Sequence, residues 1–167
     1  MIFMSQSGIT DSERMADWDR WYIEHLRIML TVPGIYSAQR FKTESEDYSP
    51  SLAMYGIAGP HVFEDPYYLS VRGMGEWLPL IDRRHYQRNL FSGLDRAPRV
   101  RQGQVLLVAD RKREDMALSE LGLTWLACSG IDRSTVLRGI AVADAIPASR
   151  KGLAIYRPVT DYLLPAR

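Results

Sequence analysis

Four side chains that can bind or react with a ligand lie within eight residues near the start of the chain. Trp18, Trp21, Tyr22 and His25 are related by steps of three and four residues, so they share one face of a helix. An imidazole titrates near about 6.5 and can act as a general acid or base. This strip predicts a ligand cleft in which His25 is catalytic and the other three contact the substrate. The alternative is that His25 is a packed core or interface histidine with one satisfied nitrogen.

The chain that follows this strip carries further candidates. Arg40 can hold a carboxylate or an enolate oxygen through two charge-assisted hydrogen bonds, and Tyr55 or Tyr36 can donate to a developing oxyanion. We expect Arg40 and Tyr55 to be catalytic, and Tyr36 and Trp77 to contact the substrate. Other interpretations stay open: an exposed strand-end charge or a dimer ion pair for Arg40, core packing for the tyrosines, and a dimer contact for Trp77.

A basic stretch supports a different function. Arginines and one histidine are concentrated between Arg83 and Arg101, with Tyr86 and Phe91 interleaved: Arg83, Arg84, His85, Arg88, Arg96, Arg99 and Arg101. This pattern suits a non-catalytic module that binds an anionic ligand such as a nucleotide or coenzyme A. The same residues are also typical of a solvated helix and loop whose arginines pair with acids of the first helix or of another subunit.

Composition excludes several classes of protein. The chain has 167 residues, of which 46% are hydrophobic and 25% charged, with a net charge of +1. These are values of a folded globular domain, and they give no global attraction to nucleic acid or membranes, so we expect neither as a partner. One cysteine, three histidines and no apolar run long enough to span a bilayer predict a cytoplasmic protein without a disulfide or a structural zinc site.

The elements that must position these residues can be read from periodicity and turn signals. A capping box formed by Thr10 and Glu13 begins a long helix that ends at Pro33-Gly34. The further expected elements are strands over 2–7, 35–42, 51–58 and 104–110, a short helix over 67–72 and a helical piece over 83–90.

The order strand, helix, strand, strand, helix, strand predicts an α+β domain with a ferredoxin-like fold over residues 1–110. Residues 111–167 are expected to form a βαβ extension: a strand over 123–129, a helix over 133–146 and a strand over 152–157. Similar turn sequences at Ser7-Gly8-Ile9 and Ser129-Gly130-Ile131 suggest that this extension is a partial repeat of the first unit.

The spacing of Trp21, His25, Pro33-Gly34 and Arg40-Phe41 resembles that of the dimeric α+β barrel proteins, and it is most similar to the EthD-like branch. The resemblance implies a homodimer in which two ferredoxin-like sheets pack face to face, with His25 facing a cleft between sheet and helices. It also implies a diverse chemistry that includes cofactor-free lyases, isomerases and monooxygenases as well as haem-handling proteins. Arg27 departs from the family pattern, which often has proline at this position.

The residues and the resemblance together predict a small-molecule cleft protein. We expect a small aromatic or cyclic organic acid as the ligand, and lyase, isomerase or monooxygenase chemistry without a cofactor. Haem, bound through His25, His61 or His85, is the alternative cofactor. A homodimer is expected because an apolar sheet face carrying Leu52, Met54, Leu106 and Val108 must be covered; that list defines the face that a second subunit would bury.

Overall fold

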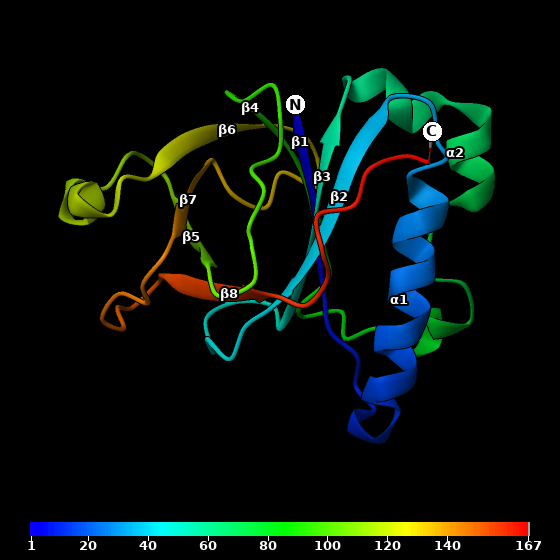
Figure 1. Cartoon of the computed structure of the whole chain (residues 1–167), viewed down its shortest axis with the longest axis horizontal. Coiled ribbons are helices and arrows are strands. Elements are labelled where there is room, and N and C mark those ends of the chain that lie inside the picture. Colours follow the sequence, from blue (N-terminus) through cyan, green and yellow to red (C-terminus); the bar gives the residue numbers. More distant parts are fainter. Residues whose placement is uncertain (167) are drawn as a thin grey trace.

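The computed structural model describes residues 1–166 and shows a closed barrel of eight antiparallel strands (Figure 1). The strands are β1 (Ile2–Ser7), β2 (Ile35–Lys42), β3 (Ser51–Ile57), β4 (Gln87–Ser92), β5 (Val105–Arg111), β6 (Thr124–Ile131), β7 (Leu137–Ala143) and β8 (Ala154–Pro158). Their order around the barrel is β1-β3-β2-β8-β5-β7-β6-β4, and β4 pairs with β1 to close the ring.

The barrel consists of two halves with the same internal arrangement. Strands β1 to β4 are neighbours in the order β4-β1-β3-β2, and β5 to β8 are neighbours in the order β8-β5-β7-β6. Each half therefore places its first strand between its fourth and its third. The halves meet at two seams, where β2 pairs with β8 and β4 pairs with β6.

The helices are distributed unequally between these halves. The first half contains α1 (Met15–Met29), α2 (Pro66–Val71) and the 3-10 turns η1 (Ser12–Arg14), η2 (Pro60–Glu64) and η3 (Gly75–Leu80), whereas the second contains η4 (Met116–Leu121). Figure 1 shows α1 and α2 on the same side of the barrel, next to β2 and β3. Within residues 1–166, no helix is long and apolar enough to cross a membrane.

The interior of the barrel is filled with side chains. Ile2 and Met4 of β1 point inward and pack with Phe41, Phe91 and other buried apolar residues. An eight-stranded barrel is just wide enough for its own side chains to fill. Alternate residues of β1, such as Phe3, point outward and pack beneath the helices, which explains why every residue of this strand is buried.

A buried arginine joins the two halves inside the barrel. Arg138 of β7 is fully buried, and its Nε and Nη2 atoms each donate to Asp110 over 2.7 Å. The Nη2 atom also donates to Oε1 of Gln6 in β1, again over 2.7 Å. The guanidinium group lies 5.0 Å from the centre of the Phe91 ring. A buried charge is tolerated only when it is paired in this way.

Helix α1 packs as its side-chain pattern predicts, but it begins differently from the prediction. Its buried residues, Trp18, Tyr22, Leu26 and Met29, form one stripe against the sheet. The predicted capping box is not formed: Asp11, rather than Thr10, accepts the hydrogen bond from the backbone N–H of Glu13, and the Thr10 hydroxyl donates to Leu80 O instead. Gly34, at φ 87°, takes the left-handed conformation after the helix.

The prediction of a ferredoxin-like dimeric α+β barrel with a βαβ extension, similar to EthD-like proteins, is wrong. The chain forms a closed eight-stranded β-barrel by itself. The apolar face for which we expected a second subunit lies inside this barrel: Leu52, Met54, Leu106 and Val108 all belong to its core. Burial of this face therefore requires no partner.

Two segments account for the incorrect fold. Residues 83–90 were expected to be helical, but β4 begins at Gln87, and the strand expected over 104–110 is the fifth rather than the fourth. The expected helix over 133–146 is instead replaced by β7. Arg138 faces the barrel interior there, so the strand lacks the alternation of apolar and polar residues that normally identifies a half-buried strand.

Candidate functional site

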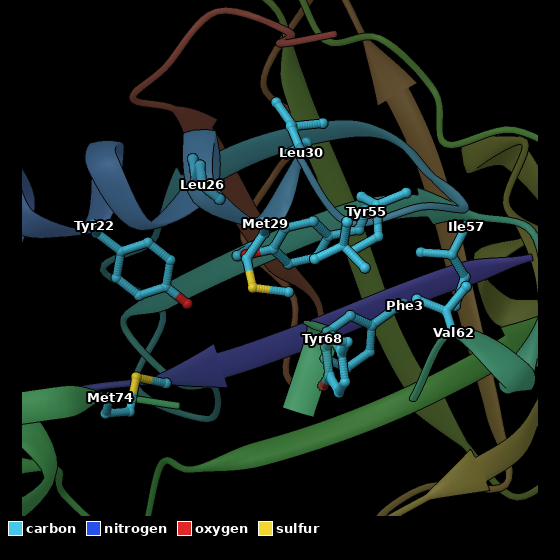
Figure 2. Close-up of a cluster of buried hydrophobic side chains, with 14 of the residues drawn as sticks. Phe3, Tyr22, Leu26, Met29, Leu30, Tyr55, Ile57, Val62, Tyr68 and Met74 are labelled. Carbon is cyan, nitrogen blue, oxygen red and sulfur yellow. The ribbon is translucent and has the colours of Figure 1, made fainter. Parts of the chain in front are cut away.

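A cleft of about 310 Å³ lies between α1, α2 and the outer face of the first half of the barrel. Its lining comes from both helices, from β1, β3 and β4, and from the segment after α2: Phe3, Ser5, Tyr22, His25, Met29, Tyr55, Tyr68, Leu69, Arg72, Gly73, Met74, Tyr86 and Arg88. Figure 2 shows Tyr22 and Met29 projecting from α1 towards the sheet, with Tyr68 and Met74 beneath them.

Four tyrosines from four segments meet in this cleft. Tyr22 lies on α1, Tyr55 on β3, Tyr68 on α2 and Tyr86 just before β4. Burial raises the pKa of Tyr22, Tyr55 and Tyr68, most strongly that of Tyr55. For Tyr22 the nearby Arg40 opposes this rise in pKa, and the Ser5 and Ser7 hydroxyls oppose it less. These three phenols stay protonated at neutral pH and can donate hydrogen bonds to a ligand.

His25 lies on the wall formed by α1. Its ring stacks on Trp21, with centroids 4.8 Å apart and planes inclined by 10°, and meets the edge of Tyr22. Burial lowers the pKa of His25 to about 4, because a low dielectric disfavours the charged form. The imidazole is consequently neutral at pH 7 and can accept a proton.

Two arginines complete the polar lining. Arg72 follows α2 and is exposed, whereas Arg88 lies on β4 and is half-buried. Nη2 of Arg88 is 3.4 Å from Oδ1 of Asp132, but its Nε atom is buried without a hydrogen-bond partner. The lining contains no aspartate or glutamate in the described part of the chain. The cleft thus presents hydrogen-bond donors and the guanidinium group of Arg72, which favour an anion, whereas Asp132 partly compensates the charge of Arg88.

The structure brings together three of the eight predicted site residues. His25, Tyr22 and Tyr55 line the cleft. Trp21 covers the outer face of His25. Trp18 and Trp77 are buried in an edge-to-face contact, with centroids 5.3 Å apart, outside the cleft lining. Tyr36 is 54% exposed on β2 and lies away from the cleft.

Arg40 lies behind the cleft rather than in it. Its side chain is only 1% exposed; Nη1 lies 2.8 Å from Oδ1 of Asp19, and Nε donates to the Ser51 hydroxyl over 3.1 Å. The guanidinium carbon is 4.3 Å from the centroid of the Tyr22 ring. Arg40 can therefore influence Tyr22, but it does not belong to the residues that line the cleft.

Sequence reasoning missed several functional groups of the cleft. Ser5, Tyr68 and Arg72 were not singled out, although Asp65-Pro66 correctly marked the start of α2, on which Tyr68 lies. Tyr86 and Arg88 were noticed only as members of the basic stretch. Tyr86 and Arg88 lie at the start of β4, which pairs with β1. This position could have identified them, but residues 83–90 were predicted to be helical.

The basic stretch does not form one surface. Arg84 pairs with Asp82 and Arg88 faces the cleft, whereas Arg96, Arg99 and Arg101 follow β4 at its other end. The histidines are also separated. His61 and His85 line two other hollows, away from His25. Among residues 1–166, no group of three or more histidine, cysteine, aspartate or glutamate side chains is arranged to hold a metal ion.

Comparisons with known proteins add no relative. A scan against protein-family models finds no match, and a search of the curated proteins finds no significant similarity. Function is therefore argued from the chemistry of the cleft.

Proposed function

We propose that this protein binds a small aromatic or cyclic organic acid in the cleft. The supporting observation is that phenols, a hydroxyl, an imidazole and two guanidinium groups converge there without a carboxylate among the lining residues. Guanidinium groups form short, strong hydrogen bonds with carboxylates. Phe3 and Tyr55 stack with centroids 5.4 Å apart and supply a flat apolar surface. A volume of about 310 Å³ suits a compact ligand with a single ring, since small-molecule sites span about 300–1,000 Å³.

The chemistry that fits these groups is proton transfer by a cofactor-free isomerase or lyase. Neutral His25 would take a proton from the carbon next to a carbonyl group, and a phenol would donate to the enolate oxygen that forms. In a ligand with a double bond between its β- and γ-carbons, the imidazolium ion would return the proton to the γ-carbon, which moves the double bond next to the carbonyl group and restores that group. A carboxylate bound beside His25 would raise the pKa of the imidazole from about 4 towards neutrality, because a nearby negative charge favours its protonated form.

Calorimetry with matched ligands tests the binding step. We expect benzoate and cyclohexanecarboxylate to bind, and benzamide, which has the shape of benzoate without its charge, to bind at least about 10-fold more weakly. Arg88→Gln should reduce benzoate affinity by a similar factor. Arg96→Gln removes an exposed arginine beyond β4 and should have no effect. Equal binding of benzoate and benzamide would contradict the proposal.

Solvent exchange tests the chemical step separately. In D₂O, 4-oxocyclohexanecarboxylate should exchange the hydrogens next to its ketone faster with the protein than without it, as followed by NMR. His25→Gln should abolish this acceleration while the carboxylate still binds. An unchanged exchange rate in the variant would remove His25 as the base and leave the binding proposal intact.

A further inference from the structure

A second and larger hollow lies on the other side of the first turns of α1. This groove has a volume of about 520 Å³ and is bounded by the start of α1, the β2–β3 hairpin and the chain around β8. Its lining residues are Gly8, Met15, Trp18, Lys42, Thr43, Glu44, Ser45, Pro50, Ser51, Ile146, Ser149, Ile155, Arg157 and Val159. Within residues 1–166, the groove and the cleft share no lining residue.

The walls of the groove are largely apolar. Met15 and Trp18 from α1 face Ile155 from β8. Ile146 and Val159 extend the same surface, although their side chains are 52% and 42% exposed. Covering such surface is favourable by about 25 cal/mol per Å². The groove therefore offers a continuous surface to the apolar body of a ligand.

The charged side chains at the rim of the groove differ in how far they are paired with opposite charges. Lys42 shares the single carboxylate of Asp19 with Arg40, so the charge of Lys42 is only partly compensated. Arg157 lies opposite Lys42 in the β2–β8 register, and its side chain has no ion pair or hydrogen bond to the described residues. Glu44 is exposed at the same rim and is the single acidic residue of the lining. Arg157 is therefore the cation of the rim that has no acidic partner among residues 1–166.

We propose that this groove is a second ligand site, which takes an amphipathic carboxylate with an unbranched apolar body. The chain of the ligand would lie between α1 and the Ile146 and Ile155 side chains, and its carboxylate would bind Arg157. Glu44 would repel the same carboxylate and limit its affinity. This site is independent of the proposed function of the cleft, because the two hollows have different lining residues.

Decanoate and decanol distinguish this site from general hydrophobic binding. In calorimetry, decanoate should bind about 10-fold more tightly than decanol, since a charged hydrogen bond adds affinity that an alcohol lacks. NMR of methyl groups should show shifts at Met15, Ile146 and Ile155 on addition of decanoate. Shifts confined to Met29 and Leu69, which line the cleft, would overturn the assignment.

Substitutions at the rim test the charge argument in both directions. Arg157→Gln should weaken decanoate binding about 5- to 10-fold and leave decanol unchanged, whereas Glu44→Gln should strengthen decanoate binding about 2-fold. Arg96→Gln, at an exposed arginine that lines neither hollow, serves as the matched control and should change the binding of neither ligand. The same affinity for decanoate in the Arg157 and Glu44 variants as in the original protein would exclude the site.

Discussion

The two halves of the barrel share a strand order but differ in what covers them. Over β1 to β4, the helices α1 and α2 cross the outer face and leave a cleft beneath them. Over β5 to β8, the turn η4 places Leu118 on a small cluster that includes Val105 and Leu107. In this chain, one sheet arrangement therefore supports both an open cleft and a small packed surface. The helices, rather than the strands, make the difference.

The largest expected effect comes from removing the guanidinium group of Arg138, which connects the two halves of the barrel. Arg138→Met leaves Asp110 and Gln6 without the guanidinium group that they share. We expect a loss of about 3–5 kcal/mol in the free energy of unfolding, as for other broken buried ion pairs, measured by urea denaturation.

A double variant distinguishes the effect of the unpaired Asp110 carboxylate from the effect of the missing Arg138 side chain. Arg138→Met combined with Asp110→Leu removes both charges and should recover most of the stability, because the unpaired carboxylate is gone. Arg40→Met removes the buried arginine of the first half. Its change in the free energy of unfolding is the comparison for Arg138→Met. A stability of Arg138→Met within 1 kcal/mol of the original protein would show that the contacts of Arg138 with Asp110 and Gln6 do not stabilise the barrel.

The next largest effect should come from the titration of His25, which lies in the half of the barrel that carries the cleft. The pKa of His25 is about 4 in the folded protein and about 6.5 in an unfolded chain, so the unfolded chain binds the extra proton between these values. Stability should therefore fall as the pH drops from about 6.5 to about 4, by about 2–3 kcal/mol. Urea midpoints measured at pH 7.5 and pH 4 report this loss.

The variant His25→Gln isolates this contribution. It should reduce the fall in stability over that pH range, since glutamine does not titrate. Asp82, whose pKa is lowered to about 2 mainly by its hydrogen bond with Arg84, contributes its own loss only at lower pH. An identical pH dependence in the variant would mean that His25 is not held neutral by burial.

The smallest expected effect comes from removing either of two N-cap aspartates, one in each half of the barrel. Asp65 accepts hydrogen bonds from the backbone N–H groups of Tyr67 and Tyr68 at the start of α2, and Asp115 accepts one from Ala117 at the start of η4. Alanine at either position should cost about 1 kcal/mol of stability. Only Asp65→Ala should also weaken benzoate binding, by about 2- to 5-fold, because Tyr68 lies in the cleft. Equal ligand affinities in the two variants would contradict the role assigned to α2.

Several local elements were predictable because one physical pattern dominated each of them. Strands were predicted over 2–7, 35–42 and 51–58 from apolar runs and alternation, and Asp65-Pro66 marked the start of α2; the structure has β3 ending one residue earlier, at Ile57. In the site, Tyr22, His25 and Tyr55 were found from helical spacing and strand position. These signals are local, so no knowledge of distant contacts was needed.

The features that were missed depend on contacts between distant residues. In β7, the inward-facing Arg138 is accepted only because Asp110 and Gln6 surround it. Gly139 of the same strand lies under the Trp125 ring, where an added Cβ atom would come within 2.9 Å of a ring carbon. Neither reason can be read from 133–146 alone. The closed barrel was missed for the same cause, because each half is completed by strands from the other.

The two seams have a consequence for the order of events during synthesis. Strand β2 can pair with β8, which ends at Pro158, only after β8 has been synthesised, and β4 can pair with β6 only after β6 has been synthesised. Until β6 and β8 have left the ribosome, the emerging first half must expose unpaired strand edges, which are prone to join other chains. Ring closure is thus a late, long-range step, and a nascent chain stalled before residue 124, which lacks both β6 and β8, would expose both edges and the open interior.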